Sequence, residues 1–233
     1  MIRVLVADDH TIVREGLKQI LAKSGDLAVA GEAANGNDVL KMVREQLWDV
    51  LVTDMSMPGR SGIELIKLVK EARPKLPVLV LSMYGEEQYA VRVIRAGASG
   101  YLNKESASEQ LVTAIRKVAA GGVYVSAAVS EALFHNLRGD TATTPHEQLS
   151  DREFQVLRLI AMGKSSTEIA AELMLSPKTV STHKTHILEK MHMSNQAELI
   201  RYAIEHKLVD ASSAEYVEGH GRRRGDQRTL GVE

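Results

Sequence analysis

Between Ile2 and about Ala120, short runs of apolar residues alternate with segments whose apolar residues recur at helical spacing. The runs are nearly all apolar and rich in β-branched residues, which indicates strands buried on both faces, as in a parallel sheet covered by helices. The predicted strands are Ile2–Ala7, Leu27–Ala34, Val50–Thr53, Val78–Leu81 and Gly100–Leu102. Five β-α units in this order predict a doubly wound α/β domain with a five-stranded parallel sheet.

The chain changes character after residue 121. Ala127–Leu137 can form a short helix, and Arg138–Pro145 is polar and turn-prone, as linkers are. Helix-start signals then follow closely at Ser150-Asp151-Arg152-Glu153, Ser165-Ser166-Thr167-Glu168, Ser176-Pro177 and Asn195-Gln196-Ala197-Glu198. Four short helices predict an all-α domain. The expected parts are 1–121, a linker at 122–148, the all-α domain at 149–209 and a disordered tail at 210–233.

Composition excludes several classes of protein. The chain has 233 residues and a formal net charge of -1, so its overall charge favours neither nucleic acid nor a membrane surface. It has no cysteine, which excludes disulfides, thiolate zinc sites and a cysteine nucleophile. Met1–Val6 lacks the features of a signal peptide, and no apolar stretch is long enough to span a bilayer. A cytoplasmic protein without a membrane partner is expected.

Chemically active side chains follow four of the predicted strands. They are Asp8 and Asp9 after the first strand, Asp54 after the third, Ser82 after the fourth and Lys104 after the fifth. In a doubly wound sheet the carboxyl ends of the strands meet at one edge, where ligands bind. Any one of these residues alone is better explained as a helix cap or a surface residue. The complete set predicts a functional site.

Three carboxylates at one edge repel one another, so a cation is needed to neutralise them. Because the expected ligands are all oxygens, Mg²⁺ fits best. The predicted ligands are Asp8, Asp9, Asp54 and the backbone carbonyl of Ser56. A carboxylate held there beside a lysine and a hydroxyl is suited to accept a phosphoryl group. Asp54 is the predicted nucleophile, Lys104 is expected to pair with the phosphoryl oxygens, and the Ser82 hydroxyl is expected to bond one of them.

The motifs "VLVADDH", "VLVTDMSMPGRSG", "VLVLS" and "GASGYLNK" resemble the receiver domain of bacterial two-component response regulators. The resemblance spans residues 2 to about 120. It implies that Asp54 takes a phosphoryl group from the phosphohistidine of a sensor histidine kinase. It also implies a switch in which Ser82 moves toward the phosphoryl group and Tyr101 changes rotamer. Kinase recognition would use the helix after Asp9, including Val13, Arg14 and Leu17.

Two details of the loops belong to the same resemblance. Pro58-Gly59 is expected to shape the loop that lets Asp54 face the metal. Glu105 follows the lysine where many receivers have a proline with a cis peptide bond. The resemblance therefore supports the role of Lys104 but does not support a cis peptide bond after it.

The helix predicted for Pro177–Met191 has the most informative polar face of the all-α domain. Its polar side carries small hydroxyl residues and lysines, with no acid before Glu189. A helix in the major groove needs such short polar side chains and phosphate donors. A solvated face on an ordinary helical bundle explains it equally well. Ser150–Val209 carries eight Lys or Arg against seven Asp or Glu, which is a weak footprint for nucleic-acid binding.

The run "LSDREFQVLRLIAMGKSSTEIAAELMLSPKTVSTHKTHILEKM", followed by "AELIRYAIEHKLV", resembles the helix-turn-helix domain of the LuxR/NarL (FixJ) family. The resemblance covers Leu149–Val209. It implies that the helix starting near Ser176 is the recognition helix and that Gln196–Glu205 is where relatives dimerise. The residues expected to face bases are Ser181, Thr182 and Thr185. Those expected to contact phosphates are Lys178, Thr179 and Lys184.

Together these features predict a two-component response regulator. Phosphoryl transfer to Asp54 would control homodimerisation and sequence-specific binding to double-stranded DNA. One alternative is a DNA-binding regulator whose receiver is a phosphate-independent dimerisation module. Another is a magnesium-dependent phosphatase, but haloacid-dehalogenase-like enzymes have a second acid two residues after the nucleophile, where this chain has Ser56. No enzyme activity is therefore expected.

Overall fold

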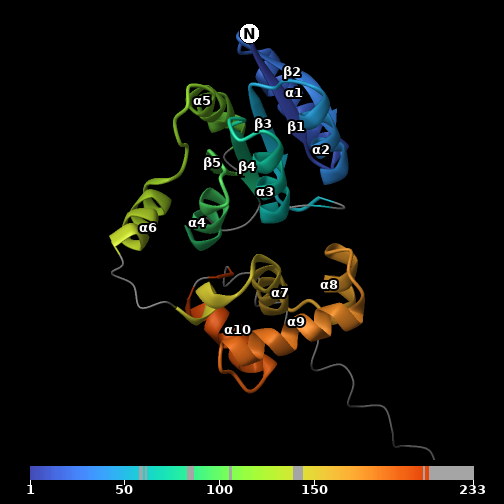
Figure 1. Cartoon of the computed structure of the whole chain (residues 1–233), viewed down its shortest axis with the longest axis vertical. Helices are drawn as coiled ribbons and strands as arrows, with labels where there is room; N and C mark the ends of the chain where they lie inside the picture. Colours follow the sequence, from blue (N-terminus) through green and yellow to red (C-terminus); the bar gives the residue numbers. More distant parts are fainter. Residues whose placement is uncertain are drawn as a thin grey trace, which may run out of the picture. The chain divides into compact units, whose positions relative to one another are not determined.

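The computed structural model describes residues 1–57, 60, 62–82, 87–104, 107–138, 144–206 and 208–209. The chain forms two compact units, Met1–Ala142 and Thr143–Glu233 (Figure 1). The predictions for Pro58-Gly59, for Glu105, for linker residues 139–143 and for the tail at 210–233 lie outside the described residues. Among the helices that are described, none is long and apolar enough to cross a membrane.

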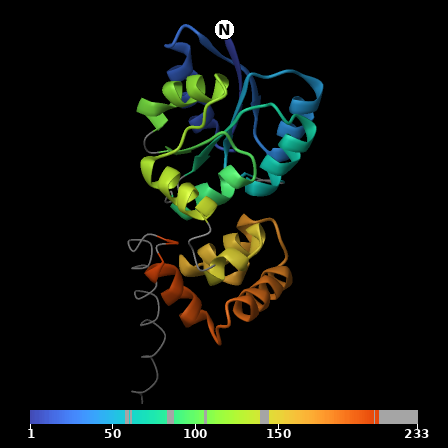
Figure 2. The ribbon, with the colours of Figure 1, turned by 60° about the vertical axis from the view of Figure 1, so that its left-hand side comes forward.

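The first unit contains the predicted five-stranded parallel sheet, in the order β2-β1-β3-β4-β5. The strands are β1 (Ile2–Ala7), β2 (Leu27–Ala33), β3 (Val50–Asp54), β4 (Val78–Ser82) and β5 (Gly100–Asn103). The helices that follow them are α1 (Thr11–Ala22), α2 (Gly36–Glu45), α3 (Gly62–Ala72), α4 (Glu87–Arg95) and α5 (Ala107–Ala119). Helices α1 and α5 contact each other, and α3 contacts both α2 and α4, so helices cover both faces of the sheet (Figure 2). This confirms the expected fold class.

Three strands, β3, β4 and β5, extend one residue further than predicted, and β2 ends one residue earlier, at Ala33. Two of the added residues, Asp54 and Ser82, carry functional groups. Asp54 pairs with Leu81 in the β3–β4 ladder, and Ser82 pairs with Asn103 in the β4–β5 ladder. Every residue of β3 and β4 is buried, because the strands lie in the middle of a sheet covered on both faces. Asp54 and Ser82 are therefore held by sheet pairing at the carboxyl edge rather than carried on loops.

After α5, the chain returns along the outer edge of β5. Tyr124 forms a parallel β-bridge with Gly100, and α6 (Ala127–Arg138) follows and packs against α4. Figure 1 shows α6 beside α4. The structure thus places the helix anticipated near Ala127–Leu137 with the first unit.

The second unit is helical, as predicted. Its elements are the 3₁₀ turn η2 (Pro145–Gln148) and helices α7 (Asp151–Ala161), α8 (Ser166–Glu172), α9 (Pro177–Lys190) and α10 (Gln196–Glu205). The predicted N-caps are confirmed. Ser150 and Ser165 form complete capping boxes, and the Ser176 and Asn195 side chains each accept a backbone N–H three residues later. Helix α7 contacts α8, α9 and α10, and its buried Phe154 is the largest side chain of this core.

Candidate functional site

Lys104 joins two carboxylates at the carboxyl edge of the sheet. Its Nζ lies 2.8 Å from Asp8 Oδ2 and 2.9 Å from Asp54 Oδ1. Asp8 follows β1, Asp54 ends β3 and Lys104 follows β5, so the pairs connect three strands. The three side chains are 1%, 6% and 13% exposed. The sheet thus brings three of the predicted site residues into one buried cluster.

The electrostatic balance of this cluster leaves Asp54 short of favourable partners. Burial raises the pKa of Asp54 above its ordinary value, the Lys104 ammonium acts to lower it, and the Asp8 carboxylate adds to the rise. Burial acts to lower the pKa of Lys104, but its bonds to Asp8 and Asp54 outweigh burial and raise that pKa overall. One protonated lysine is therefore shared between two carboxylates.

The residues that follow β1 form a cluster that could hold a metal ion. Ligand atoms of Asp8, Asp9 and His10 all lie within 4.8 Å of one another. Asp9 Oδ1 is shielded from solvent and has no hydrogen-bond donor among the described residues. His10 Nδ1 lies 2.9 Å from it, but without hydrogen-bond geometry. A buried carboxylate oxygen without a donor, beside the carboxylates of Asp8 and Asp54, fits the oxygen ligands that Mg²⁺ prefers.

The remaining predicted residues of this site lie in or just after strands β3, β4 and β5, and Tyr101 lies three residues before Lys104. Ser82 is fully buried at the end of β4, and Tyr101 is buried in β5. Ser56 is exposed, two residues after β3. The roles expected of these three residues stay predictions.

Two neighbours of the acidic pair were not assigned to the site from the sequence. The backbone N–H of His10 donates to Asp8 Oδ1 at 2.8 Å. An Arg14 guanidinium nitrogen donates to the backbone oxygen of Asp8 at 2.7 Å, so Arg14, expected only in kinase recognition, also holds this turn. The position of His10 directly after the two acids was a signal for its place in the cluster. No local pattern pointed to the contact of Arg14.

The predicted base-facing residues share one arrangement on α9. Ser181, Thr182 and Thr185 are exposed, and each hydroxyl donates to the carbonyl four residues earlier, at 3.0, 3.1 and 3.2 Å respectively. These bonds fix the side-chain rotamers and leave each hydroxyl oxygen able to accept a hydrogen bond. The helix therefore presents a row of preset acceptors.

The three predicted phosphate contacts differ from one another. Lys178 is exposed on the first turn of α9. The Thr179 hydroxyl lies 2.8 Å from the hydroxyl of the N-cap residue Ser176 and belongs to the cap. Lys184 donates through Nζ to Gln196 Oε1 at 2.6 Å, which ties α9 to the first residue of α10. In this structure Lys178 extends from the surface, whereas the other two side chains take part in internal bonds.

A second buried carboxylate ties α7 to α9. Glu153 accepts from the Ser150 N–H at 2.7 Å and the Ser150 hydroxyl at 2.8 Å, and Lys190 Nζ lies 2.7 Å from the same oxygen. Burial acts to raise the pKa of Glu153, but the bonds from Lys190 and Ser150 outweigh burial and hold that pKa below its ordinary value. Glu153 thus secures the start of α7 to the end of α9, the predicted recognition helix.

Known proteins match both units. Residues 4–116 match the response regulator receiver domain, and residues 147–203 match the luxR family of bacterial regulatory proteins. The chain is 40% identical to the oxygen regulatory protein NreC of Staphylococcus haemolyticus over 215 residues, which cover 89% of this chain and 99% of that protein. NreC of Staphylococcus carnosus is 39% identical over the same lengths.

Solved structures show the same relationship. RcsB from Salmonella enterica serovar Typhimurium, bound to promoter P1flhDC in the presence of the phosphomimetic BeF3⁻, is 30% identical with a TM-score of 0.62, covering 88% of this chain and 98% of that one. The RcsB structure with promoter rprA is also 30% identical, with a TM-score of 0.61, and covers 86% of this chain and 97% of RcsB. The motifs, the fold and these similarities agree: the chain belongs to the LuxR family of response regulators.

Proposed function

We propose that Asp54 accepts a phosphoryl group from the phosphohistidine of a sensor histidine kinase, and that this transfer controls dimerisation and sequence-specific DNA binding in the cytoplasm. The observation that carries the proposal is the bridge from Lys104 to both Asp54 and Asp8. In the transfer, the P–N bond of the phosphohistidine breaks as a P–O bond forms to an Asp54 carboxylate oxygen.

Each group of the cluster has a distinct part in this proposal. The charged Lys104 is near enough to Asp54 to pair with phosphoryl oxygens bound there, because its Nζ already lies 2.9 Å from that carboxylate. The Ser82 hydroxyl would donate to one phosphoryl oxygen, and Tyr101 would follow with a change of rotamer. Mg²⁺ would supply positive charge for the phosphoryl oxygens, held by Asp8, Asp9, Asp54 and the Ser56 carbonyl.

The second unit supplies the proposed output. RcsB has been solved as two dimers bound to two parallel DNAs. In this chain, α9 would enter the major groove with Ser181, Thr182 and Thr185 toward the bases, and Lys178 toward a phosphate. Helix α10 has the exposed apolar residue Ile204 on its surface, and we assign this helix to the dimer. Phosphorylation would favour the dimer and so place two recognition helices on one DNA.

The test is phosphorylation of the full chain with acetyl phosphate and Mg²⁺, scored by intact mass and by light scattering. Asp54→Ala is the test variant. Glu71→Ala is the matched control, because Glu71 is an exposed acid at the far end of α3. We expect one added phosphoryl group and a shift toward dimer in the wild type and the control, and neither in Asp54→Ala.

Two results would contradict the proposal. Uptake that persists in Asp54→Ala would place the phosphoryl group elsewhere. A wild type that takes no phosphoryl group, yet dimerises, would favour a receiver that works as a phosphate-independent dimerisation module.

A further inference from the structure

The segment Val123–Val125, here named the edge segment, covers the outer edge of β5. Because β5 is the last strand of the sheet, this edge would otherwise present unpaired backbone groups. The Tyr124 N–H donates to the Ser99 oxygen at 2.9 Å, and the Tyr101 N–H donates to the Tyr124 oxygen at 2.9 Å. The parallel bridge between Gly100 and Tyr124 completes the pairing. The edge segment therefore continues the sheet beyond β5.

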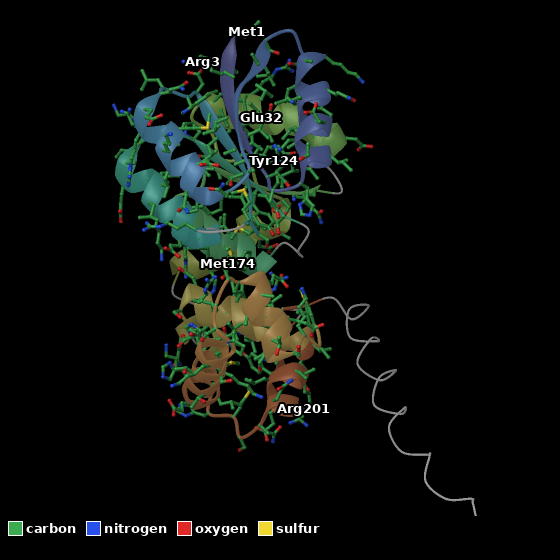
Figure 3. The ribbon with its side chains drawn as sticks, turned by 90° about the vertical axis from the view of Figure 1, so that its right-hand side faces the viewer. Met1, Arg3, Glu32, Tyr124, Met174 and Arg201 are labelled. Atoms are coloured by element: carbon green, nitrogen blue, oxygen red, sulfur yellow. The ribbon has the colours of Figure 1, made fainter. Side chains whose placement is uncertain are left out.

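The pairing requires the glycine in β5 and is reinforced by α5. A Cβ atom at Gly100 would lie 2.8 Å from Leu79 Cδ1 of β4, 2.9 Å from the Tyr124 backbone oxygen and 3.2 Å from the Tyr124 Cβ. A larger residue therefore leaves no room for the backbone of the edge segment. The Tyr124 hydroxyl donates to Gln110 Oε1 at 2.9 Å, and Lys117 Nζ lies 5.8 Å from the centre of the tyrosine ring. Both the backbone and the side chain of Tyr124 are thus held (Tyr124 is labelled in Figure 3).

The other end of β5 enters the buried cluster. Lys104, three residues beyond Tyr101, is the residue that bridges Asp8 and Asp54. At about 3.3 Å of rise per strand residue, only about 10 Å of backbone separates the Tyr101–Tyr124 bond from the lysine. The edge segment also leads directly into α6, which packs against α4 (Figure 1). One short strand therefore connects the ion pairs of Asp54 to the start of α6.

We infer that Tyr124 is a positioning residue for the Asp54 site, acting through β5, and that the edge segment carries the state of that site to α6. The inference rests on the proposed function. A doubly charged phosphoryl group on Asp54 draws Lys104 away from Asp8 and displaces the end of β5 that leads into Lys104. The edge segment follows β5 because Tyr124 is hydrogen-bonded to both Ser99 and Tyr101. Since coupling between two sites is reciprocal, loosening the edge segment alters the affinity of the Asp54 site by up to the factor by which that site changes the opening of the edge segment.

The experiment uses the full chain with Mg²⁺ and BeF3⁻ as the phosphoryl probe. Deuterium exchange of peptides that cover residues 121–130 reports the edge segment, and calorimetry reports the affinity for BeF3⁻. We expect BeF3⁻ to change exchange in the wild-type edge segment by about fivefold or more, and Tyr124→Ala to change the BeF3⁻ affinity by a similar factor. Tyr124→Phe keeps the ring over Lys117 and loses only the bond to Gln110, so it should restore most of the wild-type affinity.

A control separates positioning from general destabilisation. Val29→Ala weakens the same core from β2, the strand at the opposite edge of the sheet. If Val29→Ala changes BeF3⁻ affinity as much as Tyr124→Ala does, the effect is only structural and the inference is overturned. Unchanged exchange in the edge segment when the wild type binds BeF3⁻ overturns it as well. A wild type that does not bind BeF3⁻ overturns the proposed function, and the inference with it.

Discussion

The two units each bury a carboxylate beside a lysine, yet the pKa values of the two carboxyl groups are shifted in opposite directions. In the second unit, Glu153 pairs with Lys190 and accepts two further bonds from Ser150, and its pKa lies below the ordinary value. In the first unit, Asp54 shares Lys104 with Asp8, and its pKa lies above the ordinary value. A buried charge is stable only when its neighbours satisfy it.

The difference separates a structural acid from a reactive one. Glu153 is satisfied by the protein itself and holds two helices together. Asp54 is held in a cluster with more negative than positive charge, so the native fold pays a cost for its ionised form. A cation or a rearranged Lys104 relieves this cost, which is what a site for metal and phosphoryl groups requires.

The largest effect is expected from removing the satisfied charge. Glu153→Gln keeps the volume of the side chain but removes the charge from a buried group that accepts bonds from the Ser150 N–H, the Ser150 hydroxyl and Lys190. Because Lys190 itself is exposed, the cost comes from these weakened charge-assisted bonds, and it should be about 3 kcal/mol for the second unit at pH 7. Because the pKa of Glu153 is lowered by folding, its contribution is present above the ordinary glutamate value. This contribution is lost as the pH falls through the pKa that Glu153 has in the folded state. The difference in unfolding free energy between wild type and variant should therefore shrink in that pH range. Exchange of α7 and α9 amides in urea measures it.

Glu168→Gln provides the matched control for this variant. Glu168 forms the same capping box with Ser165 at the start of α8, but it is exposed. Glu168→Gln should lower the stability of the second unit clearly less than Glu153→Gln does. Equal costs would show that the capping box, rather than the buried pair with Lys190, accounts for the role of Glu153.

Adding Mg²⁺ should stabilise the first unit selectively, because the acidic cluster lies in that unit. At a concentration one hundred times its Kd, Mg²⁺ should stabilise the first unit by about 2.7 kcal/mol and leave the second unit unchanged. Trp48, the single tryptophan of the chain, is buried beside the start of β3, so its fluorescence during urea unfolding reports the first unit. Equal stabilisation of α7 and α9 amides would contradict a specific site in the first unit.

The smallest effect is expected from neutralising Asp54 in the presence of EDTA. Asp54→Asn should stabilise the first unit by about 1 kcal/mol at pH 7, which is about 2–4 °C for a protein of this size. Because folding raises the pKa of Asp54, the cost of ionisation is present above the folded value. The advantage of the variant should disappear as the pH falls below the ordinary aspartate value. A destabilised Asp54→Asn would show that the pair with Lys104 outweighs burial.

Most strands and helix starts could be predicted from the sequence, because strand composition and helix capping depend on residues only a few positions apart. The buried β-branched runs predicted all five strands, and the capping boxes at Ser150 and Ser165 predicted where α7 and α8 begin. Composition predicts the ends of β3, β4 and β5 one residue before Asp54, Ser82 and Asn103, because cross-strand pairing rather than local composition extends these strands. A polar residue looks like the start of a loop until its partner strand is known.

By itself the sequence determined the fold class, the family and the acids at the strand ends, since hydrophobic periodicity and capping are local. Only the tertiary structure decided which partners those residues have. It placed Lys104 between two carboxylates that the chain separates widely, directed Lys184 to Gln196, and laid Tyr124 along β5. It also decided that the pKa values of Asp54 and Glu153 shift in opposite directions. A pKa depends on burial and on all charges nearby, whatever their distance along the chain.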